Sequence, residues 1–133
     1  MSFLLSAEVR DPTRGQLAVG PTLLPPATWG PYWVVAAGPG GATYDWAIVS
    51  GGPPTVAGST AGTCRNPTGM LSLVGSGEGL WLFTRDSVAP NSTVQTMRGI
   101  AAGLGFDLNV LHPVTQADCT YDAFPSASAR IRG

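Results

Sequence analysis

The chain has 133 residues, of which 44% are hydrophobic and 11% charged, and its formal net charge is −1. This length suits one domain with a single core. No run of Lys or Arg is present, which argues against a nucleic acid partner. No apolar stretch reaches the roughly 20 residues of a membrane-spanning helix, so we expect no transmembrane segment. The 18 Gly and 12 Pro favour short strands and loops over a helical bundle.

Five segments have the alternating pattern or the β-branched and aromatic content of strands. Residues 11–15 and 39–41 are predicted turns, because they combine Pro with Gly. Residues 21–31 are an irregular connection, and residues 51–77 a long loop with one strand-like piece at 70–74. The first five residues resemble the start of a signal peptide, but charged residues follow within a few positions. We therefore predict a strand there and no signal peptide. The predicted strands are 3–10, 16–20, 32–37, 44–50 and 79–86.

The last of these strands has two distinct faces. Trp81, Phe83 and Arg85 share one face, while Leu80, Leu82 and Thr84 share the other. Both faces are largely apolar, so both should be covered. The guanidinium of Arg85 needs a partner, either an aromatic ring or carbonyl groups at the end of a barrel.

A helix over residues 90–102 is predicted next, because Val94, Met97, Ala101 and Leu104 form one apolar stripe. Glycines at 103 and 105 end it. The exit segment should then dock through its apolar side chains. We expect one domain over residues 1–124 and a frayed tail over 125–133. The docking side chains are Phe106, Leu108, Val110 and Leu111.

The order of these elements predicts an all-β fold, an up-and-down antiparallel sheet or barrel with one C-terminal α-helix packed outside. Closing a ligand-sized barrel takes about eight strands, whereas this sequence supplies about five. The barrel is therefore expected to be incomplete, and its open edges are possible sites of self-association.

The segments resemble the lipocalin family, in particular its apolipoprotein D-like and plastid branch. Residues 31–35 and 44–49 resemble that family's sixth and seventh strands, and residues 80–86 its eighth strand, ending in the family's Arg. Residues 105–108 and 116–119 resemble the segment after its helix, and residues 11–19 the hairpin of its fourth and fifth strands. The family's Gly-x-Trp motif on the first strand has no counterpart. The chain thus resembles the C-terminal part of a lipocalin that lacks the first strands.

The resemblance implies a pocket for a small hydrophobic ligand such as a lipid, sterol, fatty acid or carotenoid. With Trp81 facing inward, Trp46, Ile48 and Leu82 face outward, where the helix stripe can cover them. Arg85 would cap the barrel end. Ordinary core packing of the same side chains is the alternative reading. The implied ligand-binding residues are Leu17, Val19, Tyr32, Val34, Ala36, Ala47, Val49, Trp81 and Phe83.

The two cysteines, Cys64 and Cys119, have no redox spacing, and the single His112 has no metal-ligand spacing to either of them. Three alternatives remain for the cysteines. They pair with each other, they pair with cysteines of the missing front half as in related lipocalins, or they stay free thiols. The resemblance implies a secreted or plastid-lumenal parent protein. No cofactor or metal is expected.

Binding and carriage of a hydrophobic ligand, without catalysis, is therefore the leading hypothesis. An enzyme of the same fold, de-epoxidase-like or isomerase-like, is an alternative whose only candidate nucleophile is Cys64. A truncated remnant that binds no ligand is the other. Catalysis has little support, because the acidic residues are scattered over turns without pairing.

Overall fold

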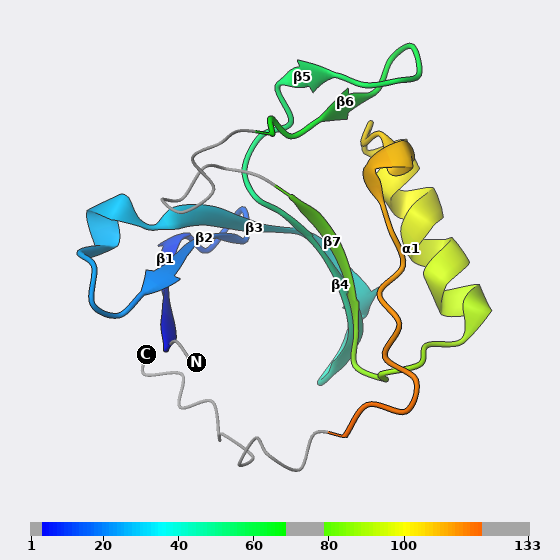
Figure 1. Ribbon diagram of the computed structural model, residues 1–133, viewed down its shortest axis with the longest axis horizontal. Coiled ribbons are helices and arrows are strands. Elements are labelled where there is room, and N and C mark those ends of the chain that lie inside the picture. Colours follow the sequence, from blue (N-terminus) through cyan, green and yellow to red (C-terminus); the bar gives the residue numbers. More distant parts are fainter. Residues whose placement is uncertain (1–3, 69–78, 121–133) are drawn as a thin grey trace.

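The computed structural model describes residues 4–68 and 79–120. Its main feature is one five-stranded antiparallel sheet in the order β1-β2-β3-β4-β7. The sheet bends into an arc, and the helix α1 lies on the outer side of that arc (Figure 1). The strands are β1 (Leu5–Asp11), β2 (Gln16–Pro21), β3 (Gly30–Pro39), β4 (Tyr44–Ser50) and β7 (Leu80–Thr84).

These strands lie close to where the alternation and turn residues predict them. Within the described residues the sheet does not close, since β1 and β7 each pair on one side only. The expectation of a mainly β fold with one late helix is confirmed. The described residues form an open arc and no closed barrel.

The helix α1 (Asn91–Gly103) packs against the convex face of the sheet. Ile48 of β4, Met97 and Ala101 of α1, and Phe106 just after α1 form the buried core. Trp46 and Leu82 pack against this core, as the parity of the strands predicts. Leu104, placed at the end of the apolar stripe by the sequence pattern, is instead 54% exposed, because it caps the C-terminus of α1. Ile100 packs against the core in its stead.

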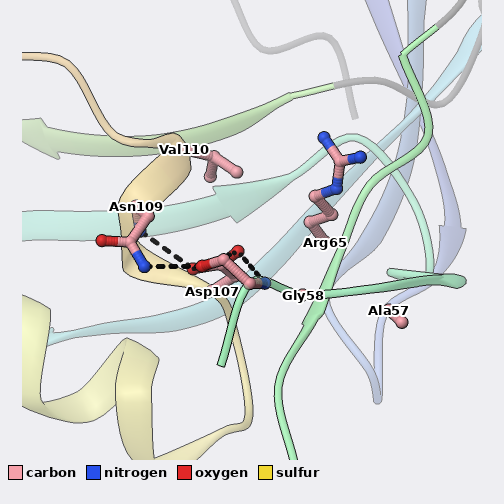
Figure 2. A pocket seen from close by; sticks show the side chains of 7 residues that line it. Ala57, Gly58, Arg65, Asp107, Asn109 and Val110 are labelled. Carbon is pink, nitrogen blue, oxygen red and sulfur yellow. Dashed lines mark hydrogen bonds between the residues drawn. The ribbon is translucent and has the colours of Figure 1, made fainter. Parts of the chain in front are cut away.

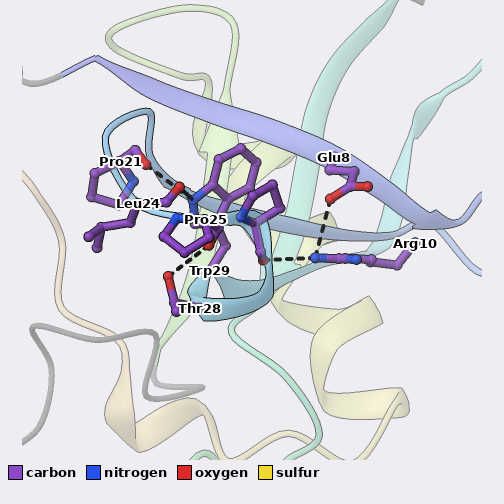
Figure 3. A network of polar contacts seen from close by, with 8 residues as sticks. Glu8, Arg10, Pro21, Leu24, Pro25, Thr28 and Trp29 are labelled. Atoms are coloured by element: carbon purple, nitrogen blue, oxygen red, sulfur yellow. Dashed lines mark hydrogen bonds and ion pairs between the residues drawn. The ribbon is translucent and has the colours of Figure 1, made fainter.

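The convex face of β1 and β2 is covered by the connection between β2 and β3, which contains the short 3-10 helix η1 (Pro26–Thr28). Trp29 lies over Gly20 so closely that a Cβ atom there would clash with the indole ring. The Trp29 indole N–H donates to the carbonyls of Pro21 at 3.1 Å and Leu24 at 3.0 Å. Arg10 donates to the carbonyl of Pro26 at 2.8 Å and pairs with Glu8 at 3.2 Å (Figure 3). The 3-10 helix and these contacts were not predicted, because residues 21–31 have no periodic pattern.

The predicted loop after β4 contains a small separate hairpin of β5 (Val56–Ala57) and β6 (Cys64–Arg65). A second 3-10 helix, η2 (Leu108–Val110), follows α1. Of the predicted docking side chains, Phe106 is buried and Leu108 packs on the core, whereas Val110 is exposed. The strand-like piece at 70–74 and the tail at 125–133 lie outside the described residues.

Candidate functional site

The strand register assembles a set of apolar side chains on the concave face of the sheet. Residues directly opposite each other on neighbouring strands project from the same face. The pairings therefore define three rows that cross the sheet on the side opposite α1. The rows are Val9, Leu17 and Tyr32; Val34, Val49 and Trp81; and Ala37, Ala47 and Phe83.

This face is open at its β7 end. Trp81 is 41% exposed and Phe83 is 46% exposed, although both are large aromatic residues in the middle of a strand. Val49 beside them is buried. Val19 of β2 lies one row further along the same face, opposite Ala7. An exposed aromatic surface at the end of a concave apolar wall is the form of a binding surface.

Ala36 does not belong to this face, and its predicted inward position is wrong. The pairing of β3 with β4 shifts by one residue between Val34 and Ala36, because Val35 is an extra residue in β3. Val35 and Ala36 both pack against the core under α1. Ala37 occupies the concave position instead, opposite Ala47. The segment gives no sign of the insertion, because both residues at the shift are apolar.

Tyr32 is the polar group of the concave wall. Its ring lies opposite Leu17 and is half-buried. Burial raises the pKa of the Tyr32 phenol above its ordinary value, because the charged form is poorly solvated there. Its hydroxyl is protonated at neutral pH, as in any tyrosine, and can donate a hydrogen bond to a ligand's polar end.

Arg85 follows β7 and lies at the end of the sheet. Its Nε donates to the carbonyl of Tyr44, at the start of β4, at 2.9 Å. The Arg85 backbone N–H also donates to the carbonyl of Asp45 at 2.8 Å, which extends the β4–β7 pairing. A carbonyl partner was one of the two expected for this guanidinium. Its role as a barrel cap stays a prediction.

Apart from the concave face, a hollow of about 430 Å³ lies between the β5–β6 hairpin and η2 (Figure 2). The Asp107 carboxylate, on a residue 3% exposed, accepts from the Ser59 N–H at 2.8 Å, the Ser59 hydroxyl at 2.9 Å and the Asn109 N–H at 3.0 Å. Hydrogen bonds, first from the Ser59 N–H and then from the Asn109 N–H, hold the pKa of Asp107 below its usual value. With its carboxylate engaged in this way, Asp107 is a clamp between two loops. The spacing of these residues in the sequence gave no signal for it.

A smaller hollow, of about 230 Å³, lies between the β3–β4 end of the sheet and the first turns of α1. It is lined by Trp46, Asp45 and three hydroxyl side chains of α1 among others. It carries no convergent pair of charged groups, and it lies on the helix side of the sheet. Neither hollow contains the residues expected for the ligand site.

Cys64 and Cys119 are both free and exposed, so the disulfide between them is not formed. Cys64 lies in β6, where its backbone N–H donates to the carbonyl of Gly105 at 2.8 Å. This position is beside the C-terminal end of α1 and is not among the rows of the concave face. The candidate nucleophile of the enzyme hypothesis thus lies away from the wall expected to hold a lipophilic substrate.

Over residues 4–68 and 79–120, no cluster of three or more His, Cys, Asp or Glu side chains is arranged to hold a metal ion. The same part of the chain contains no helix with the length and apolarity needed to cross a bilayer. Comparison with known proteins found no matching family model, no matching curated protein and no matching solved structure.

Proposed function

We propose that the concave face binds a small hydrophobic ligand, such as a fatty acid, a sterol or a carotenoid, and that the arc is an incomplete lipocalin-like barrel. The resemblance of the strand sequences to lipocalins suggests the ligand class. The fold supports it through the apolar character of the wall formed by β2, β3, β4 and β7.

One observation carries this proposal: the two faces of the sheet are covered unequally. On the convex face, Trp29 and η1 cover one end and α1 covers the other. On the concave face, the described residues leave Trp81 and Phe83 exposed, and no helix or loop among them covers these two rings as α1 covers the convex face. A contiguous apolar patch on the surface of a folded protein marks an interaction site, and Trp81 and Phe83 form such a patch with the apolar wall beside them.

The open shape limits the affinity. A flat ligand that lies on the wall buries one of its faces, so that roughly 300 Å² of combined apolar surface leaves the water. At about 25 cal/mol per Å² this burial contributes about 7 kcal/mol. Association costs several kcal/mol of this gain. Since about 7 kcal/mol corresponds to a dissociation constant of roughly 10 µM before that cost, we expect dissociation constants of tens of micromolar or weaker for the described arc. The Tyr32 hydroxyl would bind the ligand's polar end.

Tryptophan fluorescence tests the proposal directly, because Trp81 lies on the proposed site. Purified protein at 1 µM is titrated with retinol, palmitate and cholesterol. We expect concentration-dependent quenching with at least one of them. Trp81→Phe should lose most of that signal. Trp33→Phe is the matched control and should keep it, because Trp33 projects from the convex face.

A second pair of variants removes the dependence on a reporter. Phe83→Asn should weaken binding at least fivefold, whereas Val88→Asn, which changes an exposed apolar residue in the loop after β7, should not. Ligand binding measured by isothermal titration calorimetry gives both values. The proposal is wrong if no probe quenches the fluorescence in a concentration-dependent way up to 50 µM, or if the two variants weaken binding equally.

A further inference from the structure

We infer that a second copy of this chain pairs with the free edge of β7, so that two sheets join through β7 in an antiparallel, two-fold symmetric dimer. This pairing does not require the ligand proposed above. It follows from the hydrogen bonds, side chains and neighbours of β7.

The backbone groups of β7 fall into two sets. The Gly51 N–H donates to Gly79 and the Arg85 N–H donates to Asp45, and both bonds belong to the β4–β7 register. Hydrogen-bonded pairs alternate along an antiparallel ladder. Trp81 and Phe83 therefore direct their N–H and C=O groups toward β4. Leu80, Leu82 and Thr84 direct theirs away from β4, toward the side where the described residues provide no partner strand.

The outward groups of β7 match those of a second β7. When two such strands run antiparallel with Leu82 opposite Leu82, the whole strand overlaps and Leu80 lies opposite Thr84 of the other copy. All the paired backbone groups are then outward ones. This register forms about six hydrogen bonds between the chains.

The side chains match in the same register. Trp81 of each copy lies opposite Phe83 of the other, in the non-hydrogen-bonded pairs where side chains approach most closely. Aromatic pairs directly across strands are among the more stabilising ones, at roughly 0.2–1 kcal/mol each. The two exposed aromatic residues of one chain thus find their partners in the other, and the concave apolar faces become continuous.

The β1 edge differs from the β7 edge. β1 carries Glu8 and Arg10 and has a register shift between Val9 and Asp11. Charges and bulges are features that protect an edge from pairing. Residues 80–84 of β7 have no charge, no proline and no register shift. A flat, apolar and uncharged edge is the one expected to pair.

The topology favours a closed dimer. Three strands lie between the edge strands and every neighbouring pair is antiparallel, so β1 and β7 run in the same direction. Pairing of β7 with itself closes around a two-fold axis, whereas head-to-tail pairing of unlike edges gives a larger ring or an open filament. The helices also fit. α1 packs mainly on β4, so the two helices are separated by three strand spacings, about 14 Å, which exceeds a helix diameter of about 10 Å.

Sedimentation velocity tests the dimer, with the unmodified protein at 2–200 µM. We expect a species of twice the 13.6 kDa chain mass that grows with concentration. The double variant W81K/F83K places like charges opposite each other at both pairs and should weaken dimerisation at least tenfold. The double variant W81E/F83K places opposite charges there and should restore it, although it removes the apolar surface on which ligand binding depends.

A measurement on the unmodified protein needs no variant to fold. In hydrogen exchange, the amides of Leu80, Leu82 and Thr84 should exchange at least tenfold more slowly at 200 µM than at 2 µM, while exposed loop amides should not change. A monomer at 200 µM overturns the inference. So does a dimer that W81K/F83K leaves intact, or one that W81E/F83K does not restore.

Discussion

The two faces of the β4–β7 pair should respond to mutation in opposite ways, and Ile48→Ala and Phe83→Ala test this. Ile48 is fully buried beneath α1, whereas Phe83 is 46% exposed on the concave face. Replacing a buried Ile by Ala costs about 2–5 kcal/mol, since it removes transfer energy and leaves a cavity. Full burial of a Phe side chain is worth about 1.5–3 kcal/mol. With about half of its surface already in water, Phe83→Ala should cost about 1 kcal/mol.

Urea unfolding followed by circular dichroism at 2 µM measures both changes. With an m-value of about 1.5 kcal/mol/M, the midpoint should fall by about 1.3–3.3 M for Ile48→Ala and by about 0.7 M for Phe83→Ala. Ile48→Val serves as the control for position, at about 0.5–1.5 kcal/mol. The low concentration keeps dimerisation from stabilising one variant more than another.

The result that refutes this reasoning is a Phe83→Ala midpoint as low as that of Ile48→Ala. It would mean that the concave aromatic residues are part of a packed core and that the exposed wall does not exist in solution. Both the ligand proposal and the β7 dimer would then lose their surface.

Three further changes follow from contacts on the other faces. Gly20→Ala should destabilise the protein by about 1–3 kcal/mol, seen as a lower urea midpoint, because the added methyl group displaces Trp29; an unchanged midpoint contradicts this. Arg10→Met should cost less than about 1 kcal/mol in the same assay, since its partners are exposed, and a larger loss would show a buried role. Asp107→Asn should lower the free energy of unfolding at pH 7 and lower it less at pH 3. Because the pKa of Asp107 is lower in the folded state than in the unfolded state, its carboxylate stabilises the fold at pH values above the unfolded pKa. That stability is lost as the pH falls through the folded pKa. An equal deficit at both pH values would mean that the Asp107 charge contributes nothing.

The strands and the helix could be predicted because their side chains alternate or repeat with the period of the element. The same alternation separated Trp81 and Phe83 from Leu82 and so assigned the side covered by α1 correctly. This parity argument works for β7 because the strand has no register shift. It failed for Ala36 because the extra residue in β3 reverses parity, and a run of apolar residues does not reveal where a bulge lies.

The remaining features depend on contacts between segments that are distant in sequence. Asp107 binds Ser59, which is 48 residues away, and no local pattern links them. The Trp29 indole donates to carbonyls of an irregular loop, and residues 21–31 have no periodic pattern that indicates those contacts. Whether the sheet closes depends on strand number and curvature together, so counting strands could suggest an incomplete barrel but could not give the shape of the arc.

The uncovered rings of Trp81 and Phe83 also bear on how folding of this protein is monitored. Dyes such as ANS fluoresce when they adsorb to apolar surface, and their emission is commonly used to detect molten globules. Here the fully folded chain already offers such a surface. Strong dye emission would therefore accompany the native state, and a loss of emission on adding urea would mark unfolding rather than improved packing.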